Sequence, residues 1–346
     1  MGESLNMVTS FARDSPIRPF ADAIIPAMIL VTGATGFIGR VLVRLLSEAG
    51  YDVRVLMRPS AYSPALPNGV PVDAVVTGLG DPRGLRAAMV GVDVVYHLAG
   101  SERHGSRADL QGVDIQGTRA VAEAARDAGV DRIFTVSHLG ADRASAYPLL
   151  KTKGIAEESL RKSGIDYTIF RSAVLFGEGD AFTTSLACLA VAQPFFFAVP
   201  GDGDSVLQPL WVEDLANCLV WALDDESTRN ETYDLGGPEY FTLLQAAELV
   251  MRTIGVERRF LHTRPPYLRG LAVTFDSIMP GLPVSTFWLD YLAINRTTGL
   301  DTISRAFNLL PARFPSNLDY LKRTNWRRVL LRALWRRRKP GTNGKA

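Results

Sequence analysis

Short apolar runs alternate with helical patterns through the first half of the chain. The apolar, β-rich runs lie at residues 28–32, 52–57, 72–76, 92–97, 132–136 and 166–170, and helical periodicity separates them at 37–49, 83–90, 114–128 and 151–163. This alternation predicts a doubly wound α/β fold, in which a parallel sheet carries helices on both faces. Such a sheet binds ligands outside the carboxyl ends of its strands, where the strand order reverses.

The first apolar run enters a turn with three glycines. Residues 29–40 read ILVTGATGFIGR, so Gly33, Gly36 and Gly39 stand between a predicted strand and a predicted helix. The first glycine permits a tight turn, the second lets backbone N–H groups approach a phosphate, and the third lets the helix lie close to the sheet. The helix N-terminus then faces the anion, which predicts a dinucleotide site in a Rossmann-type sheet. The predicted contacts are Gly33, Thr35, Gly36, Phe37, Ile38 and Gly39.

Four later segments stand in an order typical of one enzyme family. They are His97-Leu98-Ala99-Gly100, Gly117-Thr118, Tyr147-x-x-x-Lys151 and Trp211-Val212-Glu213-Asp214. Together with the spacing Thr-Gly-x-x-Gly-x-x-Gly they resemble the short-chain dehydrogenase/reductases, in the extended or atypical branch that includes epimerase- and dehydratase-like members. The resemblance covers residues 28–255. Residues 136–142, followed by Tyr147, look most like the group of the NDUFA9-type accessory subunit of respiratory complex I.

The resemblance implies a division of the chain. Residues 28–172 would form the NAD(P)-binding Rossmann core, and residues 173–319 a smaller substrate lobe interleaved with the end of the core. The pattern there loosens into Gly- and Pro-containing segments, with helices near 213–224 and 242–255. Residues 1–27 read as a flexible extension, and Met28, directly before the first strand, is an alternative start. Residues 256–346 match little in the family.

Composition bounds the class of protein. With 47% apolar and 21% charged residues, the chain can bury one large core or two unequal ones. Cys188 and Cys218 both lie in apolar runs, so we expect buried, reduced thiols. No metal-ligand cluster is visible, and no uninterrupted apolar run of about 18 residues predicts a membrane span. The first 27 residues lack the pattern of a signal peptide. We expect a cytoplasmic protein.

Charge is distributed unevenly. The net charge is +2, but ten Lys or Arg and no Asp or Glu follow Asp319. In this basic tail, residues 320–346, an apolar stripe of helical spacing predicts an amphipathic helix; the stripe is Trp326, Val329, Leu330, Ala333 and Leu334. The helix could lie on an anionic membrane surface, or it could dock on its own domain. Nucleic acid is not an expected partner, because no binding module accompanies the basic run.

The choice of cofactor depends on the end of the second strand. An acidic residue there would repel a 2′-phosphate, but the strand at 53–57 ends in Arg58. A guanidinium pairs with phosphate, and Arg40 after the third glycine could add a second positive charge. The sequence therefore favours NADP, with NAD possible. Ala99 and Gly100 form a small-residue bend that would let the chain pass close to the cofactor, and Leu98, Ala99 and Gly100 are predicted cofactor contacts.

Tyr147 and Lys151 are the predicted catalytic pair. Four positions apart, they share one helix face, and Pro148 is tolerable only if the helix begins there. In the family, this tyrosine exchanges a proton with the substrate oxygen. The lysine lowers the tyrosine pKa and holds the nicotinamide ribose. The alternative is that Lys151 holds the ribose while Tyr147 is a packed aromatic in a protein that does not turn over.

Two positions depart from the family pattern. Ser137 ends the fifth strand and is the third catalytic candidate, but the usual position of the family serine falls on His138 or Leu139. His138 could donate a hydrogen bond in its place. Asp114 stands where the family often has an asparagine that bends a helix and serves the proton relay.

The function we predict is NAD(P)-dependent hydride transfer to or from a carbonyl or alcohol of a small-molecule substrate. Aromatic side chains in the second half favour an apolar substrate if they line a cleft, but they could equally be core; they are Phe195, Phe196, Phe197, Trp211, Phe275, Phe287 and Trp288. One alternative is a non-catalytic NADP(H)-binding accessory or assembly factor of a membrane complex. The other is a nucleotide-sugar epimerase or dehydratase. Substrate and oligomeric state stay open.

Overall fold

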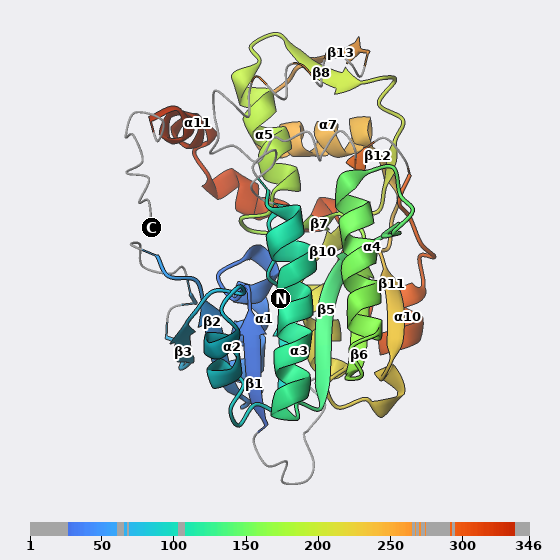
Figure 1. Cartoon of the computed structure of the whole chain (residues 1–346). Coiled ribbons are helices and arrows are strands. Elements are labelled where there is room, and N and C mark those ends of the chain that lie inside the picture. The colour runs from blue at the N-terminus through green and yellow to red at the C-terminus, as the bar shows by residue number, and fades with distance from the viewer. Residues whose placement is uncertain are drawn as a thin grey trace, which may run out of the picture.

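A computed structural model describes residues 27–60, 66–67, 69–102, 108–264, 267, 270, 274, 291–292 and 295–335. The predicted aromatic residues Phe275, Phe287 and Trp288 lie outside these residues. The described elements divide into a sheet flanked by helices and a smaller lobe beyond the carboxyl ends of its strands (Figure 1).

The sheet has seven strands in the order β11-β6-β5-β4-β1-β2-β3, and every pairing is parallel. The strand order reverses between β1 and β4, so the crevice that open α/β sheets use for ligands lies outside these two strands. The strands are β1 (Met28–Thr32), β2 (Asp52–Met57), β3 (Asp73–Val76), β4 (Val94–His97), β5 (Arg132–His138), β6 (Asp166–Ser172) and β11 (Glu231–Leu235). The predicted doubly wound α/β fold is confirmed.

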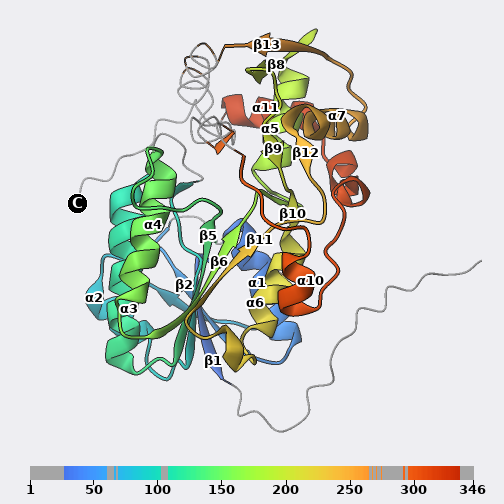
Figure 2. The ribbon, with the colours of Figure 1, turned by 90° about the vertical axis from the view of Figure 1, so that its right-hand side faces the viewer.

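Helices cover both faces of the sheet, as Figure 2 shows edge-on. One face carries α1 (Phe37–Glu48), α6 (Val212–Trp221) and α10 (Thr302–Phe307), and the other carries α2 (Pro82–Ala88), α3 (Thr118–Ala128) and α4 (Pro148–Arg161). Successive side chains of β1 point to opposite faces of the sheet, and both faces are covered by helices, so the strand is apolar on both sides. Ile29 and Val31 pack toward α1 and α6, whereas Leu30 packs toward α2 and α3.

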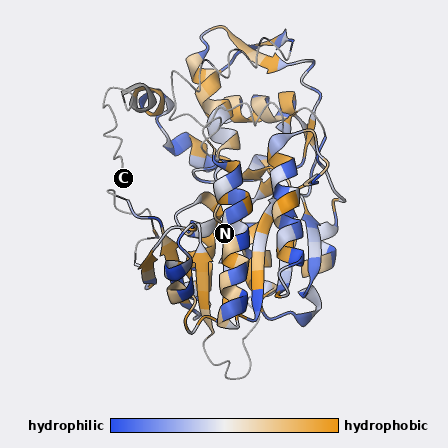
Figure 3. Cartoon of the chain, viewed as in Figure 1, coloured by the Kyte–Doolittle hydropathy of each residue, from blue (hydrophilic) through white to orange (hydrophobic). Residues whose placement is uncertain are grey.

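The lobe has its own hydrophobic core. It is built on α5 (Phe182–Ala192) and α7 (Leu243–Thr253), whose buried apolar residues belong to one cluster. Figure 3 shows that both helices are largely hydrophobic. Three strand pairs complete it: β7 (Leu175–Phe176) with β10 (Leu210–Trp211), β9 (Val206–Leu207) with β12 (Phe241–Thr242), and β8 (Phe196–Pro200) with β13 (Arg259–Thr263). Trp211 and Phe197 belong to this core, while Phe195 and Phe196 are exposed. The predicted aromatic set is thus divided between core and surface.

The C-terminal helix α11 (Trp326–Trp335) packs against α5. Trp326 is buried and donates its indole N–H to the Leu321 carbonyl at 3.0 Å, while Val329 and Leu330 pack on the lobe core. Three residues of the predicted apolar stripe therefore face the protein itself, which is the docked alternative. The part of the stripe at 333–334 has no described side chains.

Helix boundaries follow local chemistry. Asp81 caps α2 by accepting from the Arg83 and Gly84 N–H groups, and Pro82 occupies the first turn. Pro148 begins α4, as its position required, with Tyr147 as the N-cap residue. The predicted helix at 114–128 starts with a π-helical segment, η2 (Leu110–Gly117), before α3. Cys188 and Cys218 are free and buried, as expected.

Candidate functional site

The glycine turn, Gly33–Gly39, connects β1 to α1 in a conformation that side chains would block. Gly33 has φ +70°, and a Cβ there would lie 2.6 Å from the Leu98 carbonyl carbon. A Cβ on Gly39 would overlap the Gly33 carbonyl oxygen. Gly36 is the N-cap of α1 and offers no side-chain cap, and the first turn of α1 carries no acidic residue. The backbone N–H groups at this end of α1 are therefore left for an anion.

Thr35 is exposed in this turn, and Phe37 and Ile38 are half-buried. The segment that follows β4 runs directly against the turn, because Leu98 and Ala99 are the atoms a Gly33 side chain would meet. Two of the predicted segments, the glycine turn and residues 97–100, therefore meet at the point where the strand order reverses.

His97, at the end of β4, is a structural residue. Its Nδ1 lies 2.8 Å from Thr32 Oγ1 on β1, and its Nε2 lies 3.0 Å from Thr118 Oγ1 on α3. Burial and the nearby Lys153 ammonium lower its pKa to about 4, so the ring is neutral at physiological pH. Both nitrogens are used by the protein, which leaves neither for a substrate.

Two arginines lie at this edge of the sheet. Arg58 follows β2, the strand next to β1, and is exposed without a partner among the described residues. Arg40, in the first turn of α1, has a buried Nε with no hydrogen-bond partner in the described structure. The backbone of Gly179 lies close by, since a Cβ there would be 3.1 Å from the Arg40 guanidinium. Unpaired cations beside a helix N-terminus suit an anionic group, so these residues fit a dinucleotide.

A second group of side chains lies at the carboxyl ends of β4 and β5; we call Glu102, Asp114, His138 and Lys153 the polar cluster. Lys153 on α4 places Nζ 3.2 Å from Asp114 Oδ1 and 3.3 Å from Glu102 Oε2. His138 Nε2 lies 2.9 Å from the same Glu102 oxygen. The cluster adjoins the cofactor cradle, because a Cβ on Gly100 would lie 3.2 Å from Asp114 Oδ1 and 3.4 Å from Lys153 Nζ.

The polar cluster is partly buried, since its Glu102 and His138 side chains are 37% and 20% exposed. The side chains of Asp114 and Lys153 are 2% and 13% exposed. Burial alone would lower the pKa of Lys153, but the Glu102 and Asp114 carboxylates hold it above its usual value. Burial alone would raise the pKa of Glu102, but Lys153 and His138 hold it below its usual range. At neutral pH the lysine is a cation and Glu102 an anion.

Lys151 lies outside this cluster. It is exposed, and no hydrogen bond or ion pair joins it or the half-buried Tyr147 side chain to another side chain in the described parts of the chain. The predicted pair therefore does not meet the polar cluster, and the lysine that does is Lys153. The physical reason is the helix period. The buried positions of α4 recur with helical spacing at Leu149, Leu150, Thr152, Ala156 and Leu160, a stripe that includes 153 but leaves 151 outside.

Ser137 and His138 end β5 next to the polar cluster. Ser137 is 3% exposed, and its Oγ has no hydrogen-bond partner in the described structure. His138 is held by Glu102 through Nε2. Glu102 was not predicted from sequence, because nothing in the local pattern brings a residue 36 positions away to His138. Asp114 meets Lys153 from the π-helical segment η2, in the region where the family bends a helix.

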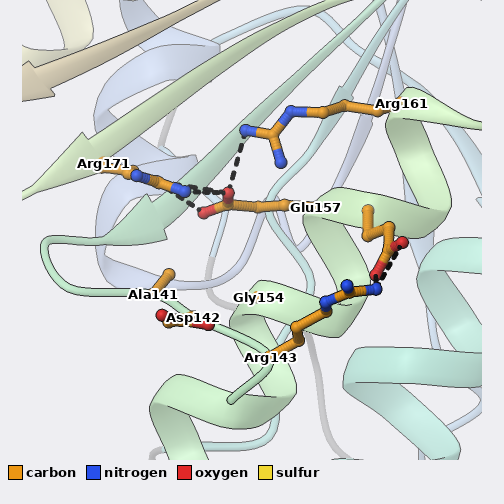
Figure 4. Close-up of a pocket in the computed structure, with 8 residues that line it drawn as sticks. Ala141, Asp142, Arg143, Gly154, Glu157, Arg161 and Arg171 are labelled. Carbon is orange, nitrogen blue, oxygen red and sulfur yellow. Dashed lines mark hydrogen bonds and ion pairs between the residues drawn. The ribbon is translucent and has the colours of Figure 1, made fainter. Parts of the chain in front are cut away.

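An open depression of about 360 Å³ lies on the outer side of α4 and β6 (Figure 4). Glu157 lies between Arg161 and Arg171 there, and Arg143 pairs with Glu158. None of the lining residues belongs to the glycine turn or the polar cluster. Because these charges already pair with one another, we assign this depression a structural role. Arg171 joins β6 to α4 within the core through its ion pair with Glu157.

Comparisons with known proteins agree with this geometry. The family model described as NAD(P)H-binding matches residues 33–195. The chain is 32% identical over 259 residues to the mitochondrial NADH dehydrogenase [ubiquinone] 1 alpha subcomplex subunit 9 of Arabidopsis thaliana, covering 73% of this chain and 64% of the relative. It is 36% identical over 193 residues to the ceramide reductase of Caulobacter vibrioides, covering 56% and 60%. It is 32% identical over 279 residues to sterol demethylase protein B of Methylococcus capsulatus, covering 72% and 81%.

Among solved structures, the NADPH complex of the Escherichia coli quinone oxidoreductase superposes with a TM-score of 0.68 at 22% identity. That match covers 85% of this chain and 99% of the other. The chain therefore shares the fold of that structure along nearly its whole length. By contrast, it spans less than two thirds of the length of the Arabidopsis and Caulobacter relatives. Within the described residues, no helix has the length and apolarity needed to cross a membrane.

Proposed function

Because the chain belongs to the extended or atypical short-chain dehydrogenase/reductases and carries an NAD(P)H-binding domain, we propose that it is an NADP(H)-dependent oxidoreductase acting on a carbonyl or alcohol of an apolar substrate. The observation that carries this proposal is the polar cluster beside the glycine turn. A histidine held by a carboxylate, next to a lysine and beside the cofactor cradle, is an arrangement that can exchange a proton with a substrate oxygen.

The glycine turn and the N-terminus of α1 would hold the pyrophosphate, with Arg40 and Arg58 as the cations for the 2′-phosphate. When bound, the nicotinamide supplies or accepts a hydride at the substrate carbon. Lys153 would hold the nicotinamide ribose, the role that the family gives to its lysine. The absence of an acidic residue after β2 supports NADP over NAD.

An apolar substrate is supported by two observations. The lobe that faces the carboxyl ends of the sheet is built around an apolar core, and the ring of Tyr291 lies across from His138 with ring centroids 6.1 Å apart. Two of the enzyme relatives are named for ceramide and sterol chemistry. A lipid-like carbonyl compound is therefore the substrate class to test first.

A second candidate function is a non-catalytic NADP(H)-binding accessory factor. The similarity to the complex I subunit of Arabidopsis supports it. So does the position one turn before Lys153, which is the buried Leu149 instead of a tyrosine. The nucleotide-sugar epimerase or dehydratase alternative is not supported at the end of β2, because the residue there is Arg58 and not an acidic residue.

The test is a titration of the protein with NADPH and NADH, followed by nicotinamide fluorescence, and then addition of apolar aldehydes and ketones. We expect NADPH to bind more tightly, and Arg58→Asp to weaken NADPH binding by roughly ten- to a hundredfold while leaving NADH binding unchanged. This range corresponds to one charge-assisted hydrogen bond of about 1.5–3 kcal/mol. Oxidation of NADPH by a carbonyl establishes the enzyme. Binding without oxidation favours the accessory factor, and no binding of either nucleotide contradicts both.

A further inference from the structure

The polar cluster contains a lysine but no tyrosine. Leu149, four positions before Lys153 on α4, is 7% exposed and carries no exchangeable proton. Tyr147 precedes Pro148 and lies outside the helix, as its N-cap residue. If the site exchanges a proton with a substrate oxygen, another side chain has to supply it.

His138 has the geometry of such a group. It is the last residue of β5, at the edge of the sheet where the cluster and the cofactor cradle meet. Its Nε2 lies 2.9 Å from Glu102 Oε2, so Nε2 carries the hydrogen that the carboxylate accepts. Its Nδ1 is buried and has no hydrogen-bond partner in the described structure. One ring nitrogen is thus anchored and the other is left to exchange a proton.

The other members of the cluster are less suited to this role. The Lys153 ammonium is held by two carboxylates, which raise its pKa above the usual value, so it releases a proton poorly. Glu102 is kept ionised by Lys153 and His138 and has no proton to give at neutral pH. Ser137 has a neutral hydroxyl, which can donate a hydrogen bond to a substrate oxygen but does not titrate near neutral pH.

We propose that His138, positioned by Glu102, is the proton donor and acceptor of this site in place of a tyrosine; the inference rests on the proposed oxidoreductase function. In the reducing direction, the substrate carbonyl carbon receives a hydride from the reduced nicotinamide, and the C=O double bond becomes single. The oxygen takes the proton from Nδ1 of the imidazolium, giving an alcohol, an oxidised nicotinamide and a neutral imidazole. Solvent then returns one proton to His138. Alcohol oxidation is the reverse.

Reduction therefore needs the imidazolium and falls as pH rises. The charged and titratable groups near His138 come from several elements. They are Glu102 from the segment after β4, Lys153 and behind it Asp114 from α4 and η2, and the ring of Tyr291. The Arg296 guanidinium lies 4.3 Å from the centre of the Tyr291 ring.

The activity test uses NADPH with benzil, an aromatic diketone, as the probe. The variants are His138→Gln, Tyr147→Phe and, as a matched control, His262→Gln on the exposed strand β13. We expect His138→Gln to lose about a hundredfold or more of the rate, the usual range for a general acid, with NADPH affinity unchanged. Loss of the rate in Tyr147→Phe with full activity in His138→Gln would overturn the inference and return the role to Tyr147.

A second readout does not depend on turnover. In protein labelled with ¹⁵N-histidine, the His138 resonances are assigned by their loss in His138→Gln. The inference expects neutral His138 to carry its hydrogen on Nε2, and the Nδ1 signal to shift when NADP⁺ is added, whereas the His262 signals do not move. A hydrogen on Nδ1, or no shift with saturating NADP⁺, contradicts the inference and leaves the oxidoreductase function standing. If the Nδ1 signal shifts but none of the carbonyls is reduced by NADPH, the oxidoreductase function is overturned, and the catalytic role of His138 with it.

Discussion

At the scale of single residues, Lys151 and Lys153 differ by two positions in one helix and by their whole environment. Lys151 is exposed to solvent, whereas Lys153 is buried between the carboxylates of Glu102 and Asp114. A motif of tyrosine and lysine four apart matches Lys151, but the buried side of α4 contains Lys153. Periodicity is the stronger guide here, because a residue can act on a ligand only from the face that its helix turns toward the site.

Lys153→Met should weaken NADPH binding, because it removes the ammonium that we assign to the nicotinamide ribose. The expected loss is about 1.5–3 kcal/mol, or roughly ten- to a hundredfold in the dissociation constant. Fluorescence titration with NADPH measures it, with a thermal melt to show that the variant is folded.

Lys151→Met is the matched control, since it removes the same charge from the exposed face of the same helix. It should bind NADPH as the unchanged protein does. A large loss of affinity in Lys151→Met, with Lys153→Met unaffected, would restore Lys151 to the site.

At the scale of elements, α4 is held to β6 by a buried carboxylate. Glu157 on α4 is 2% exposed and accepts from Arg171 Nε at 3.0 Å and from the Arg161 guanidinium at 3.1 Å. The hydrogen bonds that Arg171 donates to Glu157 also hold the pKa of Arg171 above its usual value. Since α4 carries Lys153 as well, this contact helps to fix the helix that presents the lysine to the site.

Glu157→Gln should destabilise the protein by about 3 kcal/mol, the lower end of the range for breaking a buried ion pair, because both arginines keep some contact with solvent. Urea denaturation measures the loss. Glu123→Gln, which breaks an exposed pair with Arg119 on α3, is the control and should change the stability little. Equal effects of the two substitutions would show that Glu157 is not a structural anchor.

At the scale of the whole molecule, the segment around residues 312–314 contacts the sheet unit first and then enters the core of the lobe. The Asp214 carboxylate on α6 accepts the Ala312 backbone N–H at 2.7 Å, and Phe314 two residues later lies in the lobe core. Burial, with a smaller contribution from Glu213, raises the pKa of Asp214 to about 6. A carboxyl group therefore lies where the two parts of the molecule are joined.

The stability contributed by Asp214 should depend on pH. The folded protein binds the proton of the Asp214 carboxyl group more tightly than the unfolded chain does. The stability that this protonation contributes is therefore complete below about pH 4 and is lost as pH rises through about 6. The loss is on the order of 3 kcal/mol for a shift of this size. Asp214→Asn should remove this dependence.

Denaturation midpoints measured from pH 4 to pH 8 test this expectation. The difference between Asp214→Asn and the unchanged protein should grow in favour of the variant as pH rises. The exposed Asp202→Asn is the control and should run parallel to the unchanged protein. If the pH profile of Asp214→Asn also runs parallel to that of the unchanged protein, the expectation is contradicted.

The sequence by itself determined the sheet strands up to β6 and the glycine turn. Each of these rests on a local requirement. A strand buried on both faces has to be apolar throughout, and a turn that presses on Leu98 and Ala99 has to be glycine at Gly33. Short-range pattern is enough in such cases, and the bounds of β1 and β2 agree with the prediction to the residue.

Only the tertiary structure decided which side chains meet. It placed β11 beside β6, turned Trp326 into the lobe, and brought Glu102 to both His138 and Lys153. These contacts join residues far apart in the chain, and their charges exist in a buried site only because each compensates another. No local period encodes that compensation, so the lysine and the histidine that we propose for the site became recognisable only in the fold.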